Sequence, residues 1–113
     1  MNTNELLKSI EGLLSKINKI KDGRKTVTTA GTREKIDISD VTEWIIITAE
    51  TDNTGYVVVG GDTVVAALAT RRGTPLNVGD TITLAVDNPN RIWLDVTVSG
   101  DGITYLYGVK EEL

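Results

Sequence analysis

The sequence of 113 residues contains no cysteine, no histidine and no phenylalanine. Without cysteine there is no disulfide framework, no thiolate nucleophile and no cysteine-ligated zinc site. Without histidine the chain lacks the commonest general base and the commonest transition-metal ligand. These absences exclude Ser-His-Asp hydrolases, Cys-His proteases and zinc hydrolases, and they disfavour a cupin-like metal enzyme.

Aromatic residues and long apolar runs are also scarce. The aromatic side chains are two tryptophans and three tyrosines. No uninterrupted apolar run approaches the roughly 20 residues that a membrane span requires. Apolar residues make up 40% of the chain and charged residues 25%, as in ordinary globular proteins. We therefore expect a small folded protein that is not an enzyme and has no cofactor and no membrane partner.

The net charge of −4 is divided unevenly along the chain. Residues 1–25 carry a net charge of +3, whereas residues 26–113 carry −7. An acidic body repels nucleic acid, so we expect no nucleic-acid partner. The basic segment either contacts an acidic partner or forms the solvated face of a helix.

Apolar residues near the N-terminus follow a heptad pattern. Their spacing of 4, 3, 4 and 3 predicts a helix over residues 3–21 that ends at Asp22 and Gly23. The residues that form the apolar seam, and that we expect to mediate oligomerisation, are Leu6, Ile10, Leu13, Ile17 and Ile20.

A helix of this length is marginal in water, so its apolar stripe must be buried. It either packs on the sheet of its own chain or self-associates into a short parallel coiled coil. Leu7 and Leu14 widen the stripe, which suits three or more helices better than two. We therefore divide the chain into an oligomerising helix, residues 1–23, and a β-domain, residues 24–113.

The rest of the chain has the composition of a β-protein. Threonine, valine and isoleucine supply 35 of the 88 residues from 26 onward, and these side chains favour strands. The residues 63–69 are ambiguous between a strand, a short helix and a loop. Seven or eight short strands separated by turns predict an antiparallel β-sandwich or jelly roll. The expected strands are residues 25–29, 33–38, 43–49, 56–59, 81–86, 91–98 and 103–108.

The order of strands and turns predicts pairings. Residues 43–49 are almost continuously apolar and are expected to form a central strand. The turn at 52–55 predicts a hairpin between residues 43–49 and 56–59. The turn at 99–102 predicts a second hairpin, between residues 91–98 and 103–108. Alternation places two sets of residues on buried faces: Ile36 and Ile38; and Ile82, Leu84 and Val86.

A few side chains are candidates for surface contacts. Trp93 is out of phase with Ile92, Leu94, Val96 and Val98, so it is expected to point outward. It would then serve as a subunit contact or as a platform for a sugar ring. Arg71 and Arg72 either contact an acidic partner or are solvated.

The carboxylates offer little catalytic chemistry. Asp62, Asp80 and Asp101 lie beside glycines, and we expect them to bond the backbone of their own turns. Asp87 and Asp95 flank a turn, but nothing in the sequence predicts that they face each other as glycosidase carboxylates must. We expect no metal site.

Two long segments resemble a known group of proteins. These are NTGYVVVGG at residues 53–61 and GTPLNVGDTITLAVDNPNRIWLDVTVSGDGITYLYG at residues 73–108. Their order and spacing resemble those of small structural proteins of tailed-bacteriophage virions, of the head-decoration, head-fibre or neck-associated type. The resemblance implies assembly onto a virion without catalysis.

The expected protein is then a homotrimer that binds the major capsid protein or another virion protein. It would lie on the capsid surface or neck after synthesis in the host cytoplasm, and would have no small-molecule ligand. The alternative is a carbohydrate- or receptor-binding module of a phage tail or an adhesin, with Trp93 and nearby acidic residues as its site.

Overall fold

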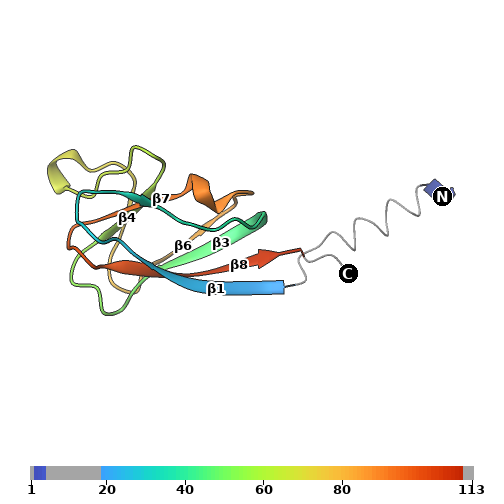
Figure 1. Ribbon diagram of the computed structural model, residues 1–113, viewed down its shortest axis with the longest axis horizontal. Helices are drawn as coiled ribbons and strands as arrows, with labels where there is room; N and C mark the ends of the chain where they lie inside the picture. The colour runs from blue at the N-terminus through green and yellow to red at the C-terminus, as the bar shows by residue number, and fades with distance from the viewer. Residues whose placement is uncertain (1, 5–18, 111–113) are drawn as a thin grey trace.

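The computed structural model describes residues 2–4 and 19–110 (Figure 1). Residues 19–110 form eight strands and two short 3-10 helices. None of the helical segments within these described residues has the length and apolar character of a membrane span. The elements are β1 (Lys19–Thr26), β2 (Glu34–Lys35), β3 (Thr42–Ala49), β4 (Val57–Gly60), η1 (Leu68–Thr70), β5 (Thr74–Leu76), β6 (Thr81–Leu84), η2 (Pro89–Arg91), β7 (Trp93–Val96) and β8 (Gly102–Val109).

The strands form two antiparallel sheets of four strands each, which confirms the expected mainly-β class and strand number. Sheet I has the order β1-β8-β3-β6, and sheet II has the order β2-β7-β4-β5. In Figure 1, β4 and β7 lie in one layer, and β1, β3 and β8 lie in the other. The two sheets share one hydrophobic core, to which alternate residues of the strands contribute. Its fully buried members include Ile45 and Ile47 of β3, Val57 of β4, Leu94 of β7 and Ile103 of β8.

Three of the strand predictions are confirmed. β3 lies between β8 and β6 and is a central strand of sheet I. Ile82, Leu84 and Val86 all pack against the core. Ile36 and Ile38 are both buried, although the strand that precedes them, β2, has only two residues. The ambiguous segment 63–69 contains a single isolated bridge, Val65 to Arg72, and runs into η1.

Both predicted hairpins are wrong, because the turns that were expected to join paired strands carry the chain from one sheet to the other. β4 pairs with β5 and β7 in sheet II and does not pair with β3. β8 pairs with β1 and β3 in sheet I and does not pair with β7. A turn sequence sets where the chain reverses, but the sheet that the next strand joins depends on long-range packing.

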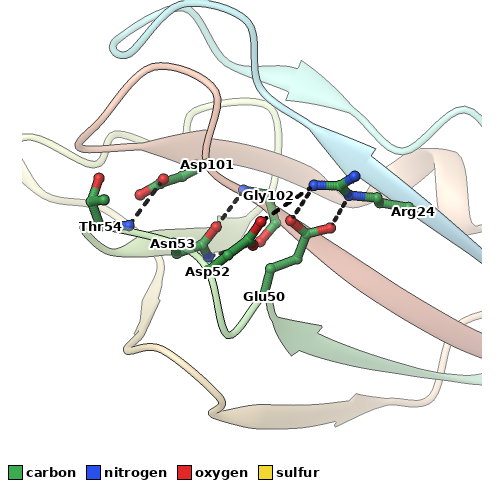
Figure 2. A network of polar contacts seen from close by, with 7 residues as sticks. All are labelled: Arg24, Glu50, Asp52, Asn53, Thr54, Asp101 and Gly102. Atoms are coloured by element: carbon green, nitrogen blue, oxygen red, sulfur yellow. Dashed lines mark hydrogen bonds and ion pairs between the residues drawn. The ribbon is translucent and has the colours of Figure 1, made fainter.

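Side chains of these crossing loops are tied together (Figure 2). Asn53 donates to the carbonyl oxygen of Gly102 and accepts from its amide, both at 2.9 Å. The carboxylate of Asp101 accepts from the amides of Thr54 at 3.1 Å and Gly55 at 2.8 Å. The connection from β3 to β4 is therefore held against the connection from β7 to β8.

The prediction of an N-terminal helix is wrong for the C-terminal part of the predicted segment. Residues 19–23 lie in β1, which pairs with β8 along all eight of its residues. Ile20, which was expected in the helical seam, is a strand residue with 60% exposure. Leu6, Ile10, Leu13 and Ile17 lie outside the described residues.

The expected strand 25–29 overlaps β1 only at residues 25 and 26, and the rest of β1 was missed because its residues, KIKDGRKT, are mostly charged and show no apolar alternation. It is an edge strand of sheet I, where charged side chains are common. Ion pairs fasten it to three other segments: Lys21 to Asp40 at 3.2 Å, Lys25 to Glu34 at 3.0 Å, and Arg24 to Glu50. The acidic partner of these basic residues is thus the chain's own body.

Gly23 and Tyr105 are opposite each other in β1 and β8. The ring of Tyr105 occupies the space that a side chain on Gly23 would take, so any Cβ there would collide with the phenol. The glycine is therefore explained by close packing inside a strand, and it does not end a helix as the sequence predicted.

Candidate functional site

Trp93 lies on the face of sheet II that points away from the shared core. Its neighbours in β7, Leu94 and Val96, enter the core, whereas Asp95 lies on the same face as Trp93. The indole packs against a second, smaller cluster of Val58, Val64 and Ala66 and remains partly exposed. The predicted outward orientation of Trp93 is therefore correct with respect to the core, but the side chain is half covered by the loop that follows β4.

A hollow of about 570 Å³ opens beside Trp93. One wall is formed by Gly31, Thr32 and Arg33 from the connection between β1 and β2, and the other by Asp62 from the loop after β4. In β7, Trp93 is paired with Lys35 of β2 on one side and with Gly60 of β4 on the other. Gly60 has no side chain, and the space where its Cβ would lie is bordered by Val64, from the loop after β4, and by Gly73.

Asp95 braces the two loops that form this hollow. Its carboxylate is 1% exposed and accepts hydrogen bonds from the amides of Gly31 at 2.9 Å, Ala66 at 2.8 Å and Val96 at 2.9 Å. Gly31 belongs to one wall of the hollow, and Ala66 belongs to the loop that carries Asp62. A carboxylate that accepts several amide bonds holds its partners firmly, because charge-assisted hydrogen bonds are stronger than neutral ones.

Arg71 and Arg72 do not line the hollow. The guanidinium of Arg71 donates from Nε to the carbonyl oxygen of Ala66 at 3.0 Å and lies 5.3 Å from the centre of the Tyr56 ring. Arg72 is exposed and bonds through its backbone to Val65. The structure therefore does not bring these two arginines together with Trp93. Arg71 supports the loop of Ala66, while the Arg72 side chain faces solvent.

The charges of the hollow itself are Arg33 and Asp62. Neither forms a hydrogen bond or an ion pair with another side chain or backbone group in residues 2–4 and 19–110. By contrast, Lys21, Arg24 and Lys25 all have carboxylate partners. The expected bond from Asp62 to its own turn is therefore not formed, and its carboxylate faces the hollow and solvent.

The other carboxylates serve structural roles. Asp80 accepts from the amide of Asn77 at 2.9 Å within its own turn, as expected. Asp101 was expected to do the same but bonds Thr54 and Gly55 in a neighbouring loop. Asp87 is exposed and lies 3.8 Å from Arg91, whereas Asp95 is buried. In the described part of the chain, no three acidic residues are grouped so that they could hold a metal ion.

The end of the body nearest residue 19 contains a titratable group of three residues. Asp40 accepts from the hydroxyl of Tyr107 at 2.9 Å and from Lys21 Nζ at 3.2 Å, and these bonds lower the pKa of Asp40. Burial, together with the bond to Asp40, raises the pKa of Tyr107 to about 12.

The loop that forms one wall of the hollow is held at its base by Glu34. Its carboxylate accepts from the amide of Thr28 at 2.8 Å and from Lys25 Nζ at 3.0 Å, and these two bonds lower the pKa of Glu34. The connection from residue 28 to residue 34 is thus closed on itself, which positions Thr32 and Arg33.

Sequence reasoning missed Thr32 and Arg33 as neighbours of Trp93, and it gave Asp62 a different role. These residues are about 30 positions apart and lie in loops, so neither periodicity nor motif spacing connects them. The one sequence signal for the site was the phase of Trp93 in its strand. No family model, no curated protein and no solved structure matches this chain.

Proposed function

We propose that this chain is a non-enzymatic structural protein of a tailed-bacteriophage virion. It assembles as a homotrimer through its N-terminal segment and attaches to the major capsid protein or to another virion protein, at the capsid surface or the neck. The two antiparallel sheets form a β-sandwich of the jelly-roll-like type. The resemblance of residues 53–61 and 73–108 to small virion proteins supports this assignment.

The main structural support for the proposal is the short distance in sequence between the heptad residues and the first strand of the body. The last heptad residue outside the described part is Ile17, and β1 begins only two residues later, at Lys19. Three bundled N-terminal segments would therefore bring three bodies close together, since there is no linker to separate them.

Exposed apolar side chains lie at this same end of sheet I. Ile20 is 60% exposed and Val41 is 77% exposed. Val41 precedes Thr42, and both Thr42 and Lys19 are paired with Val109 of β8. Large apolar side chains with such exposure are candidates for subunit contacts, and a trimer joined at residue 18 would cover them.

The ion pairs of β1 support a structural role. Because Asp40, Glu34 and Glu50 fasten this strand to three separate segments, a bundle that holds residue 18 also holds the whole body. The buried carboxylates Asp95 and Asp101 are each engaged by backbone amides, which is a structural use of acidic residues.

The solution mass of the full-length protein tests the proposal. Multi-angle light scattering should give about three times the chain mass of 12.2 kDa. Leu13→Asp places a charge in the seam and should convert the trimer to monomer. The matched control Ser15→Asp adds the same charge at a position outside the seam and should remain trimeric.

A monomeric wild-type protein would refute the oligomer, and equal behaviour of the two variants would refute the heptad seam. Attachment is measured separately, as co-sedimentation of the protein with capsids from which it has been removed. Equal attachment of the Leu13→Asp variant and the wild type would show that trimerisation is not required for binding.

A further inference from the structure

We propose that the hollow beside Trp93 binds a saccharide, with a pyranose ring against the indole and hydroxyl groups bonded to Asp62 and Arg33. This inference concerns sheet II and its loops and does not depend on the virion role or on the N-terminal segment. It rests on the geometry of the hollow, on two charged side chains that have no partner within residues 2–4 and 19–110, and on the hydrogen bonds that hold its walls.

The partly exposed indole supplies the apolar surface. Trp93 is held in place by Val58, Val64 and Ala66, yet it still lines the hollow. The faces of aromatic rings carry negative potential, whereas the C–H groups on one face of a sugar ring are slightly positive. A sugar ring is apolar on that face and polar at its edge, so stacking covers the indole without burying hydroxyl groups.

The charged residues supply the polar contacts. A carboxylate is an acceptor and a guanidinium is a fork of donors, so Asp62 and Arg33 complement hydroxyl groups, which both donate and accept. Neither side chain has a partner among the described residues, so binding would break no existing ion pair. The hydroxyl of Thr32 lies in the same wall as Arg33 and adds a further polar group.

The balance of charge distinguishes among ligand classes. The lining contains one positive and one negative side chain, so the hollow does not concentrate charge of either sign. The attraction of a phosphate to Arg33 would be offset by its repulsion from Asp62, so the lining gives a strongly anionic group no net electrostatic attraction. An uncharged ligand with many hydroxyl groups fits this lining better, and this favours a neutral saccharide.

The walls are positioned before any ligand arrives. The buried carboxylate of Asp95 bonds the amides of Gly31 and Ala66, which lie in the two opposing loops. Glu34 closes the base of the first loop by bonding the amide of Thr28. Sites that are held in their bound conformation lose less conformational entropy on binding.

The size of the hollow limits how much of a ligand it can hold. Its volume of about 570 Å³ falls within the range of small-molecule sites. It lies on the surface of a sheet between two loops, so it accommodates the end of a glycan or a short part of one. A single stacked ring with few polar contacts should bind with a dissociation constant on the order of 1 mM.

The experiment begins with a glycan array probed with labelled full-length protein. The saccharide that binds best is then titrated in free form, at concentrations up to tens of millimolar, while amide and indole N–H resonances are followed by NMR. A free saccharide is monovalent, so the titration does not depend on the oligomeric state. A monomeric protein could therefore still bind the saccharide, and a trimeric protein could still fail to bind it.

Four variants locate the site. Trp93→Ala should weaken binding about tenfold or more, and Asp62→Asn and Arg33→Gln about fivefold each. The matched control is Trp44→Ala, which removes the other tryptophan, on β3 of sheet I, and should bind as the wild type does. Asp62 and Arg33 are exposed and have no side-chain partner among the described residues, so their variants keep the test valid if Trp93→Ala fails to fold.

Three results would overturn the proposal. The first is the absence of binding to every saccharide on the array and in solution. The second is binding that Asp62→Asn and Arg33→Gln leave unchanged. The third is a set of shifted resonances that excludes the Trp93 indole and the residues 31–33 and 62.

Discussion

Replacing Asp95 with asparagine should lower the free energy of unfolding by about 2–4 kcal/mol. The two carboxylate oxygens of Asp95 have different partners: Oδ1 accepts from the amides of Gly31 and Val96, and Oδ2 accepts from the amide of Ala66. An amide has only one oxygen. When that oxygen takes the Oδ1 position, the amide NH₂ faces the N–H of Ala66, donor against donor.

The magnitude comes from these three bonds. Ala66 is fully buried, so its unpaired N–H costs about 1–3 kcal/mol. The other two bonds lose their charge assistance, at about 1 kcal/mol each, and part of this loss is offset because a buried charge has been removed. A domain is typically stable by about 5–15 kcal/mol, so the change is a large part of the total.

Urea unfolding followed by circular dichroism measures the effect as a lower midpoint with an unchanged slope. The matched control is Asp80→Asn, because exposed Asp80 bonds the single amide of Asn77, and its loss should cost less than about 1 kcal/mol. If the two variants differed by less than about 0.5 kcal/mol, the claim that Asp95 braces the loops would be refuted.

Two further predictions concern close packing and pH. In Gly102→Ala the new Cβ would collide with the carbonyl oxygen of Lys25 in β1, so the variant should lower the free energy of unfolding by about 3 kcal/mol or more. The control Gly61→Ala, whose Cβ meets no atom within 4 Å, should change it by less than about 1 kcal/mol. Similar unfolding midpoints for the two variants would contradict this prediction. Because the pKa of Tyr107 is raised to about 12 from an ordinary value near 10, the stability it contributes is complete below about pH 10 and is lost as the pH rises toward 12. The ultraviolet absorbance of tyrosinate should include a component that titrates toward pH 12 and that Tyr107→Phe removes; absence of that component would count against the Tyr107–Asp40 bond.

Sequence patterns predicted well those strands whose buried residues can be recognised from the order of neighbouring residues. The run WIII at residues 44–47 and the alternation of Ile82 and Leu84 mark strands that pack on the core. Ile36 and Ile38 follow the same rule, although the paired part of their strand is short. In each case the period of two along a strand decides which side chains face the interior, and that period can be read from the sequence.

The elements that sequence patterns predicted badly depend on partners far along the chain. β1 carries mostly charged residues, and it is a strand because β8 pairs with it and because Asp40, Glu34 and Glu50 neutralise its cations. The two hairpins were wrong for a related reason. A turn reverses the chain in the same way whether the next strand stays in the sheet or crosses to the other one.

The candidate site was likewise predicted only in part from the sequence. The phase of Trp93 against Leu94 and Val96 predicted that the indole would leave the core. The wall residues Arg33 and Asp62 could not be found, because they belong to two loops that are distant in sequence and line the same hollow only in the folded chain. Asp95 was considered only as a catalytic carboxylate, and its brace on two distant amides is invisible in the sequence.

By itself, the sequence determined the β-rich character of the body, its approximate number of strands and the faces that its apolar residues bury. These properties follow from residue type and from a spacing of two, which act over a few residues. Only the tertiary structure decided which sheet each strand joins, that residues 19–23 form an edge strand, and that Arg33, Asp62 and Trp93 share one hollow. These outcomes depend on packing and on hydrogen bonds between residues 29 to 69 positions apart, which no local pattern encodes.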